Sequence, residues 1–115
     1  MTLHLYGIPN CDTVKKARNW LEAQGRDYVF HDYKKEGADP ARLGQWADQT
    51  GWEVLLNRKG TTFRKLTDAE REGIDRAKAI ALMSAQPSLI KRPVVEHPGG
   101  VLVGFDAAAW TAALG

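Results

Sequence analysis

The sequence predicts an α/β fold in which a strand–helix–strand unit is followed by helices, then by a hairpin and a last helix. Three observations support this prediction. In about the first fifty residues, apolar side chains first recur at every second position, then at every third or fourth position, and then again at every second position, as in a strand, a helix and a strand. The middle of the chain carries helix caps and helical spacing, and the last quarter has two short β-branched runs across a Gly-rich turn. The length of the first connection favours parallel pairing of its two strands through a right-handed crossover.

The N-terminal unit is predicted from alternation, helical spacing and turn residues. Residues 3–6 alternate and run into a turn that contains Pro9, which is typical of a strand and its end. Residues 12–24 place apolar side chains at three- and four-residue spacings, so we expect a helix there, with Gly25 as its stop. Residues 28–33 are aromatic and β-branched, which predicts the second strand.

The middle of the chain is predicted to alternate helices and loops. Asp39 is expected to cap a helix that begins at Pro40 and ends near Gly51. Thr67 and Glu70 form a capping-box pattern, so another helix should begin there. Residues 34–39 are expected to form a charged loop and residues 52–56 a short apolar turn. Residues 57–60 are expected to form a basic loop and residues 77–85 a helix.

The C-terminal part is predicted to be a hairpin followed by a helix. Residues 94–97 and 101–103 flank a Pro-Gly-Gly turn. Asp106 is expected to cap an Ala-rich helix that ends at Leu114. No shift in composition marks a second domain, so we expect one domain over residues 1–115.

Composition and charge narrow the class of protein. Among the 115 residues, 43% are hydrophobic and 26% charged, which excludes disorder, collagen and coiled coil. We expect no membrane span and no signal peptide, because no apolar run is long enough and the basic start of a leader is missing. The net charge of +2 is too small to indicate direct binding to nucleic acid or an anionic membrane. The single cysteine excludes an internal disulfide and a cysteine-only metal site, which fits a reducing cytoplasm. We expect a monomer.

Cys11 is the main candidate for chemistry because it lies where the first strand passes into the first helix. Free N–H groups and the positive end of the helix stabilise a thiolate at such a position. The ordinary cysteine pKa of about 8.5 can fall there by about one unit or more. The surface-facing Pro-Asn-Cys turn favours a reactive thiol over a cysteine packed as a small hydrophobe. Because position 14 is Val14, a redox cycle needs an external thiol.

Several motifs along the chain occur together in a known family. They are Tyr6-Gly7-Ile8-Pro9-Asn10-Cys11-Asp12-Thr13, Lys15-Lys16-Ala17, Leu55-Leu56-Asn57, Arg64-Lys65-Leu66 and Leu89-Ile90-Lys91-Arg92-Pro93. In order and spacing they resemble the arsenate reductase (ArsC)-like family over essentially the whole chain, and within it the Spx/MgsR/YffB branch, with the YffB proteins nearest. The resemblance implies a thioredoxin/glutaredoxin-like βαβ…ββα core with a helical insertion at about residues 39–86.

The resemblance also implies roles for individual residues. The family's nucleophile falls on Cys11, and the arginine before its cis-proline falls on Arg92, with Pro93 as that proline. Arg92 would lower the pKa of the thiol and clamp an anionic group, and Pro93 would present backbone groups to a peptide-like ligand. We further expect substrate-binding roles for residues beside the cysteine and for two basic positions: Asn10, Asp12, Thr13, Lys15 and Arg58.

The chain departs from the arsenate reductases at three positions of their site. Their histidine four residues before the cysteine is replaced by Gly7, and two of their arginines align with Asn57 (next to Arg58) and near Gly104. These departures argue against arsenate reduction. Spx regulators carry a Cys-x-x-Cys switch, and Val14 at its second position excludes a dithiol switch but not partner binding.

Together these features predict an oxidoreductase: a monothiol, glutathione-dependent thiol–disulfide reductase. Cys11 would attack an oxidised substrate or form a mixed disulfide with glutathione, and a second glutathione would release it. Glutathione is then a co-substrate, and no cofactor is bound. One alternative is an Spx-like regulator that binds RNA polymerase, and a second is an arsenate reductase.

The remaining polar and aromatic candidates are expected to be structural. His4, His31 and His97 are scattered, and strand histidines are more often packed or solvated than catalytic, so no metal site is expected. Arg18 is expected on a solvated helix face. The four tryptophans are expected to pack in the core or between helices.

Overall fold

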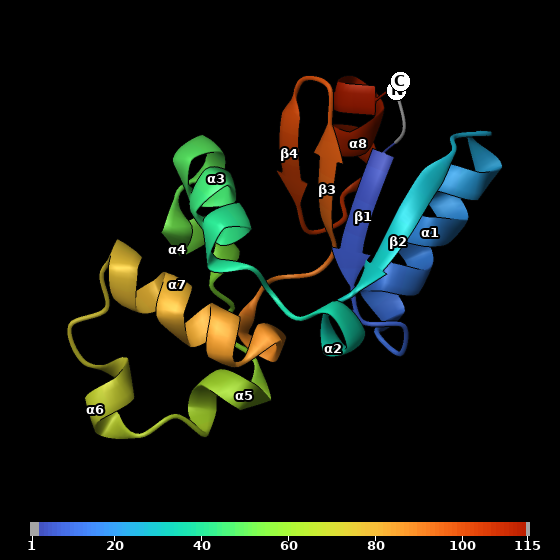
Figure 1. The fold of residues 1–115 in the computed structure, drawn as a ribbon. Coiled ribbons are helices and arrows are strands. Elements are labelled where there is room, and N and C mark those ends of the chain that lie inside the picture. Colours follow the sequence, from blue (N-terminus) through green and yellow to red (C-terminus); the bar gives the residue numbers. More distant parts are fainter. Residues whose placement is uncertain (1–2, 115) are drawn as a thin grey trace. The chain divides into compact units, whose positions relative to one another are not determined.

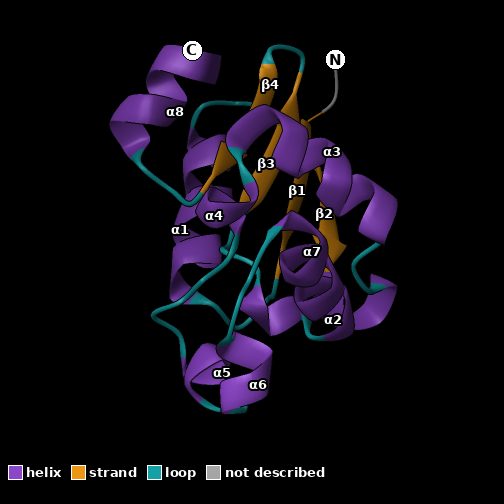
Figure 2. Cartoon of the chain, turned by 90° about the vertical axis from the view of Figure 1, so that its left-hand side faces the viewer, coloured by secondary structure: helices purple, strands orange, loops and turns teal. Residues whose placement is uncertain are grey.

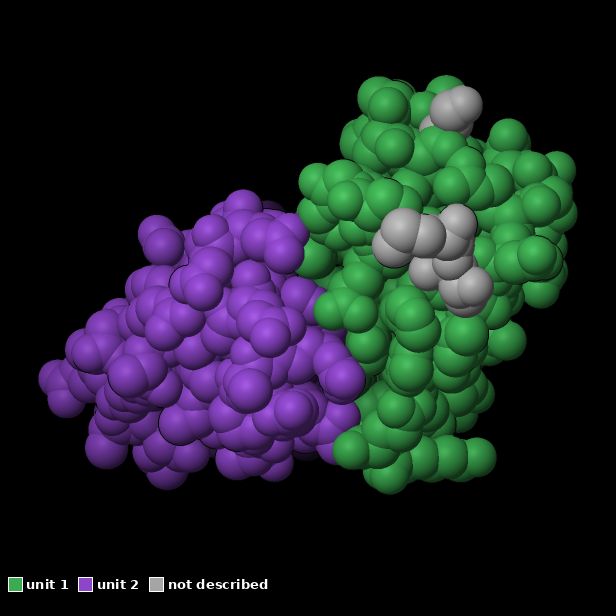
Figure 3. Space-filling model, turned by 45° about the horizontal axis from the view of Figure 1, so that its top comes forward, with its two compact units in different colours: residues 1–36, 92–115 green, residues 37–91 purple. Residues whose placement is uncertain are grey.

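The computed structural model describes residues 3–114, which form two compact units. Unit 1 holds the described residues up to Glu36 and those from Arg92 onward, and unit 2 is Gly37–Lys91 (Figure 3). Unit 2 contains the predicted helical insertion. The prediction of one domain over the whole chain stays a prediction.

Unit 1 is built on a four-stranded sheet in the order β2-β1-β3-β4 (Figure 1). Its strands are β1 Leu3–Gly7, β2 Tyr28–Asp32, β3 Val94–His97 and β4 Gly100–Val103. β1 pairs with β2 in parallel, whereas β1–β3 and β3–β4 are antiparallel. The predicted parallel crossover and the predicted hairpin are therefore confirmed. The crossover connection is the helix α1, Asp12–Ala23.

One face of the sheet packs against α1 and the C-terminal helix α8, Ala107–Leu114. Alternation along β1 sends Leu3 and Leu5 to this face, where they are fully buried. The rest of the cluster comes from α1, β3 and α8: Val14, Ala17, Leu21, Val95, Trp110 and Leu114. The helical stripe predicted in residues 12–24 is thus the buried side of α1.

The ends of α1 and α8 follow the predicted capping residues. α1 begins after its N-cap Cys11, and Gly25, just past its end, has φ of +67°, a conformation that favours glycine. The Asp106 carboxylate accepts a hydrogen bond of 3.0 Å from the Ala108 N–H at the start of α8. Both predicted helices therefore form within one or two residues of the expected bounds.

Unit 2 is helical (Figure 2). Within its described residues, a single antiparallel β-bridge joins Leu56 to Ile90. Its helices are α3 Pro40–Thr50, α4 Trp52–Leu55, α5 Thr61–Arg64, α6 Asp68–Arg71, α7 Arg76–Ala85 and the 3₁₀ turn Pro87–Leu89. The Asp39 carboxylate accepts from the Ala41 N–H at 3.0 Å, and the capping box of Thr67 and Glu70 is present. Large apolar side chains of this unit are buried: Leu43, Trp46, Leu55, Leu56, Met83, Leu89 and Ile90.

The structure corrects the sequence prediction in three short segments. Residues 34–39 were predicted as a loop, but α2, Tyr33–Glu36, occupies the first part. The turn forms because Asp32 accepts from the Lys34 N–H at 2.8 Å, as a helix cap does, and because Tyr33 is buried. Residues 52–56 form the one-turn helix α4 instead of an irregular turn, and α5 was not predicted.

No helix in the part of the chain from residue 3 to residue 114 has the length and apolarity needed to cross a membrane.

Candidate functional site

Cys11 occupies the N-cap of α1, directly after the turn that follows β1. Its own N–H donates to the Ile8 carbonyl at 3.2 Å, and its carbonyl accepts from the Lys15 N–H at 3.0 Å, which closes the first turn of α1. Its backbone is extended, with φ −93° and ψ 125°, as N-cap residues usually are. The side chain is half-buried and packs against the core of unit 1.

Opposing effects set the acidity of the Cys11 thiol. Partial burial raises its pKa, because a charged thiolate loses solvation. Hydrogen bonds to the sulfur from the Val14 N–H, the Arg92 side chain and the Thr13 N–H lower the pKa, and so does the positive charge of Arg92. The lowering effects together are larger, so the pKa of Cys11 lies below its ordinary value. The site therefore favours the nucleophilic thiolate.

The segment that brings Arg92 to the cysteine is the entry to β3. The Arg92–Pro93 peptide bond is cis, as the family resemblance implied. Pro93 is buried, and its carbonyl accepts from the Gly104 N–H at 2.8 Å. A peptide-like ligand would have to share that carbonyl, so the substrate-binding role of Pro93 stays a prediction.

Of the other predicted binding residues, three lie beside Cys11 in unit 1 and one lies in unit 2. Asn10, Asp12 and Thr13 flank Cys11 and are exposed, so their side chains are accessible beside the thiol. Arg58 belongs to unit 2, where its guanidinium carbon lies 5.6 Å from the centre of the Trp52 ring. Its predicted contact with a substrate at Cys11 stays a prediction.

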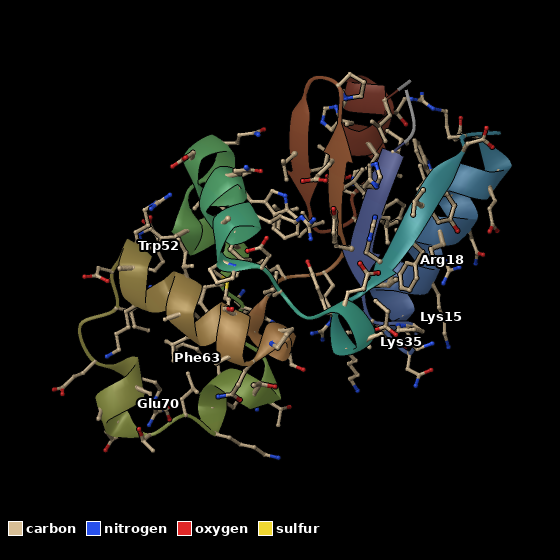
Figure 4. The ribbon with its side chains drawn as sticks, viewed as in Figure 1. Lys15, Arg18, Lys35, Trp52, Phe63 and Glu70 are labelled. Atoms are coloured by element: carbon tan, nitrogen blue, oxygen red, sulfur yellow. The ribbon has the colours of Figure 1, made fainter. Side chains whose placement is uncertain are left out.

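Lys15 lines a pocket that the sequence did not predict. The pocket has a volume of about 370 Å³ and is lined by Pro9, Lys15, Arg18, Asn19 and Glu22. Lys15 and Arg18 project from the same part of unit 1, where α1 lies beside β2 (Figure 4). A charged pocket thus lies along the helix that begins at the nucleophile.

Arg18 is more than a solvated side chain, which corrects the prediction. Its Nε donates to the Tyr28 hydroxyl at 3.0 Å, and its guanidinium carbon lies 4.3 Å from the centre of the Phe30 ring. These contacts come from β2, and they hold the guanidinium in place through a hydrogen bond and a cation–π interaction. The sequence signal that could have indicated a role for Arg18 is its position on α1, seven residues after Cys11.

Two of the histidines that looked scattered in the sequence are neighbours in the fold. His4 Nδ1 lies 2.9 Å from His31 Nε2, and His31 Nδ1 lies 2.9 Å from Glu36 Oε1. The parallel pairing of β1 with β2 creates this cluster, and Tyr6 stacks on the His31 ring with ring centres 4.4 Å apart. Across residues 3–114 no group of three or more His, Cys, Asp or Glu side chains is arranged to hold a metal ion.

The departure from arsenate reductases at Gly7 has a steric reason in this chain. A Cβ atom at position 7 would lie 2.8 Å from Val14 Cγ2. The absence of a side chain at Gly7 therefore lets β1 approach α1 closely, and a histidine at this position requires a shift of α1 or a smaller residue than Val14. Gly104, near another aligned arginine, has φ of +77°, which disfavours any side chain.

Known proteins match this chain over nearly its full length. A YffB protein of known structure is 55% identical, with a TM-score of 0.96, over 99% of this chain and 100% of that one. An arsenate reductase (ArsC) related protein from Brucella melitensis is also 55% identical, with a TM-score of 0.77, over 97% and 93% of the two chains.

The curated proteins that are similar in sequence to this chain include a transcriptional regulator. An uncharacterised protein of Haemophilus influenzae is 40% identical over 95% of this chain and 96% of its own length. The global transcriptional regulator Spx of Streptococcus pyogenes is 27% identical over 89% of this chain and 77% of its own length.

The fold of unit 1, with Cys11 at the start of α1, agrees with the ArsC/thioredoxin-like folds of these structures. The sequence matches the ArsC family over residues 6–113. This protein belongs to the ArsC family, whose members include arsenate reductases and Spx regulators.

Proposed function

We propose that this protein is a monothiol, glutathione-dependent thiol–disulfide reductase with Cys11 as its nucleophile. The observation that carries the proposal is the lowered pKa of the half-buried Cys11 thiol, whose thiolate form is stabilised by Arg92 and by the N–H groups of Val14 and Thr13. These donors stabilise negative charge on the sulfur before and after each exchange step.

The proposed reaction consists of two thiol–disulfide exchanges. In the first, the Cys11 thiolate attacks the glutathione sulfur of a mixed disulfide, R–S–SG. A bond forms between Cys11 and glutathione, and the thiolate R–S⁻ leaves and takes up a proton. In the second, a glutathione thiolate attacks the Cys11–glutathione disulfide, releases Cys11 as thiolate and leaves as oxidised glutathione. The net reaction is R–S–SG + GSH → R–SH + GSSG, so one free glutathione is consumed and the glutathione of the substrate leaves as part of oxidised glutathione.

The monothiol character of the proposal rests on position 14. In a Cys-x-x-Cys motif the second thiol would stand at this position, which here is the fully buried Val14. Cys11 is the one cysteine of the 115-residue sequence, so the second thiol has to come from solution. The proposal therefore includes a reducing, glutathione-containing compartment, the cytoplasm, and a monomer without a bound cofactor.

The test is a coupled assay with bis(2-hydroxyethyl) disulfide, reduced glutathione, glutathione reductase and NADPH. We expect the wild type to accelerate NADPH oxidation and Cys11→Ser to give the uncatalysed rate. Intact-mass measurement should show the wild type gaining one glutathione after incubation with oxidised glutathione. A wild type that neither turns over nor forms the adduct would overturn the proposal.

A second candidate function is favoured by the Spx relatives, which are transcriptional regulators. In this alternative the protein binds RNA polymerase and its thiol chemistry is secondary. The discriminating experiment is a pull-down of purified RNA polymerase with wild type and Cys11→Ser. Retention of polymerase by both forms, together with no turnover in the coupled assay, favours the regulator.

Arsenate reduction is the third candidate, because a relative with 55% identity is described as related to arsenate reductase. The steric conflict at Gly7 and the positive φ of Gly104 weigh against the oxyanion site of those enzymes. Arsenite formation from arsenate with glutathione and glutaredoxin is the measurement. We expect a rate no greater than that of Cys11→Ser.

A further inference from the structure

The charged side chains of the pocket beside α1 form a stripe that starts at Cys11. Lys15, Arg18 and Glu22 follow the cysteine by four, seven and eleven positions. On an α-helix these positions lie within about 40° of Cys11 around the axis. Cα–Cβ bonds on a helix tilt toward its N-terminus, so the Lys15 side chain starts toward the thiol. The Arg18 guanidinium is held by Tyr28 and Phe30 of β2.

One hydroxyl group positions a cation and an anion in this pocket. The Tyr28 hydroxyl accepts from Arg18 Nε at 3.0 Å and donates to Glu22 Oε1 at 3.2 Å. The bond to Tyr28 uses Nε, so the guanidinium keeps its terminal N–H donors for a ligand. Arg18 is also stacked over Phe30, with 4.3 Å from its guanidinium carbon to the ring centre. The pocket thus presents fixed charges of both signs.

We propose that this pocket binds the α-amino-acid end of the γ-glutamyl group of glutathione. Its carboxylate pairs with Lys15 and Arg18, and its ammonium group pairs with Glu22. The inference rests on the proposed function, because it assigns a binding site to the co-substrate of the same cysteine. It names Lys15, Arg18 and Glu22 as residues that position glutathione for exchange at Cys11.

The dimensions of glutathione match this placement. Its γ-glutamyl α-carbon is separated from the thiol sulfur by about seven covalent bonds, a span of roughly 8 Å. Along α1, the rise from Cys11 is about 6 Å to Lys15 and about 10 Å to Arg18, so the span of glutathione is comparable with the distance from the thiol to these two positions. The pocket volume of about 370 Å³ lies in the range of small-molecule sites and accommodates an amino-acid group.

Glu22 distinguishes recognition of an amino acid from simple attraction of a negative molecule. Glutathione carries a net negative charge, so a site that works only by long-range attraction is weakened by a nearby carboxylate. A site that binds an ammonium group and a carboxylate together needs that carboxylate. Replacing Glu22 therefore changes the rate in opposite directions under the two explanations.

The first experiment compares Lys15→Ala with Lys16→Ala, in which the neighbouring exposed lysine is removed from a position about 140° around the helix. The rate of Cys11 glutathionylation by oxidised glutathione should fall about 5- to 10-fold in Lys15→Ala and change less than about 2-fold in Lys16→Ala. The ratio of the rate with oxidised glutathione to the rate with the uncharged bis(2-hydroxyethyl) disulfide should fall in Lys15→Ala and stay that of the wild type in Lys16→Ala. Equal rates of the two variants with oxidised glutathione would overturn the assignment.

The second experiment measures Glu22→Gln with oxidised glutathione and with its N-acetylated form, which lacks the ammonium groups. We expect Glu22→Gln to react more slowly than the wild type with oxidised glutathione. The wild type should react faster with unmodified than with N-acetylated oxidised glutathione, and Glu22→Gln should react with both forms at similar rates. A faster reaction of Glu22→Gln would show attraction without recognition, and equal wild-type rates with the two forms would place another part of glutathione here. Either result overturns the proposal.

Failure of this inference differs from failure of the proposed function. If the wild type neither turns over in the coupled assay nor forms the adduct with oxidised glutathione, the glutathione-dependent reductase itself is wrong, and the pocket assignment falls with it. If the wild type forms the adduct and the variants match it, the reductase stands and only the γ-glutamyl site is wrong. Circular dichroism of each variant confirms that the fold is retained.

Discussion

The acidity of the Cys11 thiol depends on a balance between lost solvation and gained hydrogen bonds. Burial raises its pKa, while the Val14 N–H, the Arg92 side chain and the Thr13 N–H lower it by stabilising the thiolate. Two of these donors belong to the first turn of α1 and come with the helix. The third comes from the entry to β3, so it depends on the tertiary fold.

Removing the Arg92 side chain should raise the pKa of Cys11. In Arg92→Ala the thiolate loses a hydrogen-bond donor and a positive charge, but it keeps the Val14 and Thr13 N–H groups. The measurement is the rate of alkylation by iodoacetamide as a function of pH. Arg92→Lys retains the charge and is expected to have an intermediate pKa. An identical pH profile for wild type and Arg92→Ala would show that Arg92 does not act on the thiol.

A methyl group at position 7 should destabilise the fold through Val14. The Cβ of Gly7→Ala would lie 2.8 Å from Val14 Cγ2, so β1 or α1 has to shift, at a cost of about 1–3 kcal/mol. Urea unfolding of Gly7→Ala, Val14→Ala and the double variant measures this contact. The double variant should be less destabilised than the sum of the two single variants. Strict additivity would mean that the two residues do not meet.

The helix α8 depends on a single cap and on one buried aromatic side chain. The Asp106 carboxylate accepts a hydrogen bond from the Ala108 N–H at the N-terminus of the helix. Trp110, on the buried side of the same helix, has 1% of its surface exposed. The Trp110 Nε1 donates to the Gly104 carbonyl at 3.0 Å, and its ring packs edge-on against Phe105 and Trp20. The helix therefore covers the sheet through a few specific contacts.

Loss of the α8 cap should lower the free energy of unfolding by about 1 kcal/mol in Asp106→Ala. Asp106→Asn is the matched control, because asparagine caps helices about as well as aspartate. Urea titrations followed by tryptophan fluorescence give both values. If Asp106→Asn is as unstable as Asp106→Ala, the charge of Asp106 and not its capping bond is responsible.

Sequence patterns predicted the long helices of this protein better than the short ones. The helices α1, α3 and α7 each have ten or more residues, and apolar spacing or caps predicted all three. The helices α2, α4 and α5 have four residues each, which is too short for a helical period to appear. α2 in particular exists because Tyr33 is buried and Asp32 caps the turn, and burial is a property of the folded chain.

The stability of the whole protein should depend on pH through Cys11. The folded state holds the pKa of this thiol below its ordinary value of about 8.5, which applies to the unfolded chain. Between these two values the unfolded state binds more protons, so stability rises with pH and reaches its full gain above the unfolded pKa. Below the folded pKa, the thiol is protonated in both states and the contribution is lost.

The measurement is the unfolding free energy of wild type minus that of Cys11→Ser across pH 5 to 9.5. This difference should increase as the pH rises, because all other titrating groups are common to both proteins. Adding Arg92→Ala to both backgrounds should reduce the increase. A difference that stays constant or falls with pH would contradict a lowered pKa.

The sequence by itself determined the order of the long elements, the strand-to-helix position of Cys11 and the ends of α1, α3 and α8. These features follow from residues close in the chain: apolar spacing, Asp39 and Asp106 as caps, and glycine at Gly25. Only the tertiary structure decided which distant residues meet, because strand pairing and sheet order set those contacts. It brought Arg92 to Cys11, His4 to His31, and β2 beside α1, so that Tyr28 and Phe30 hold Arg18 in a charged pocket.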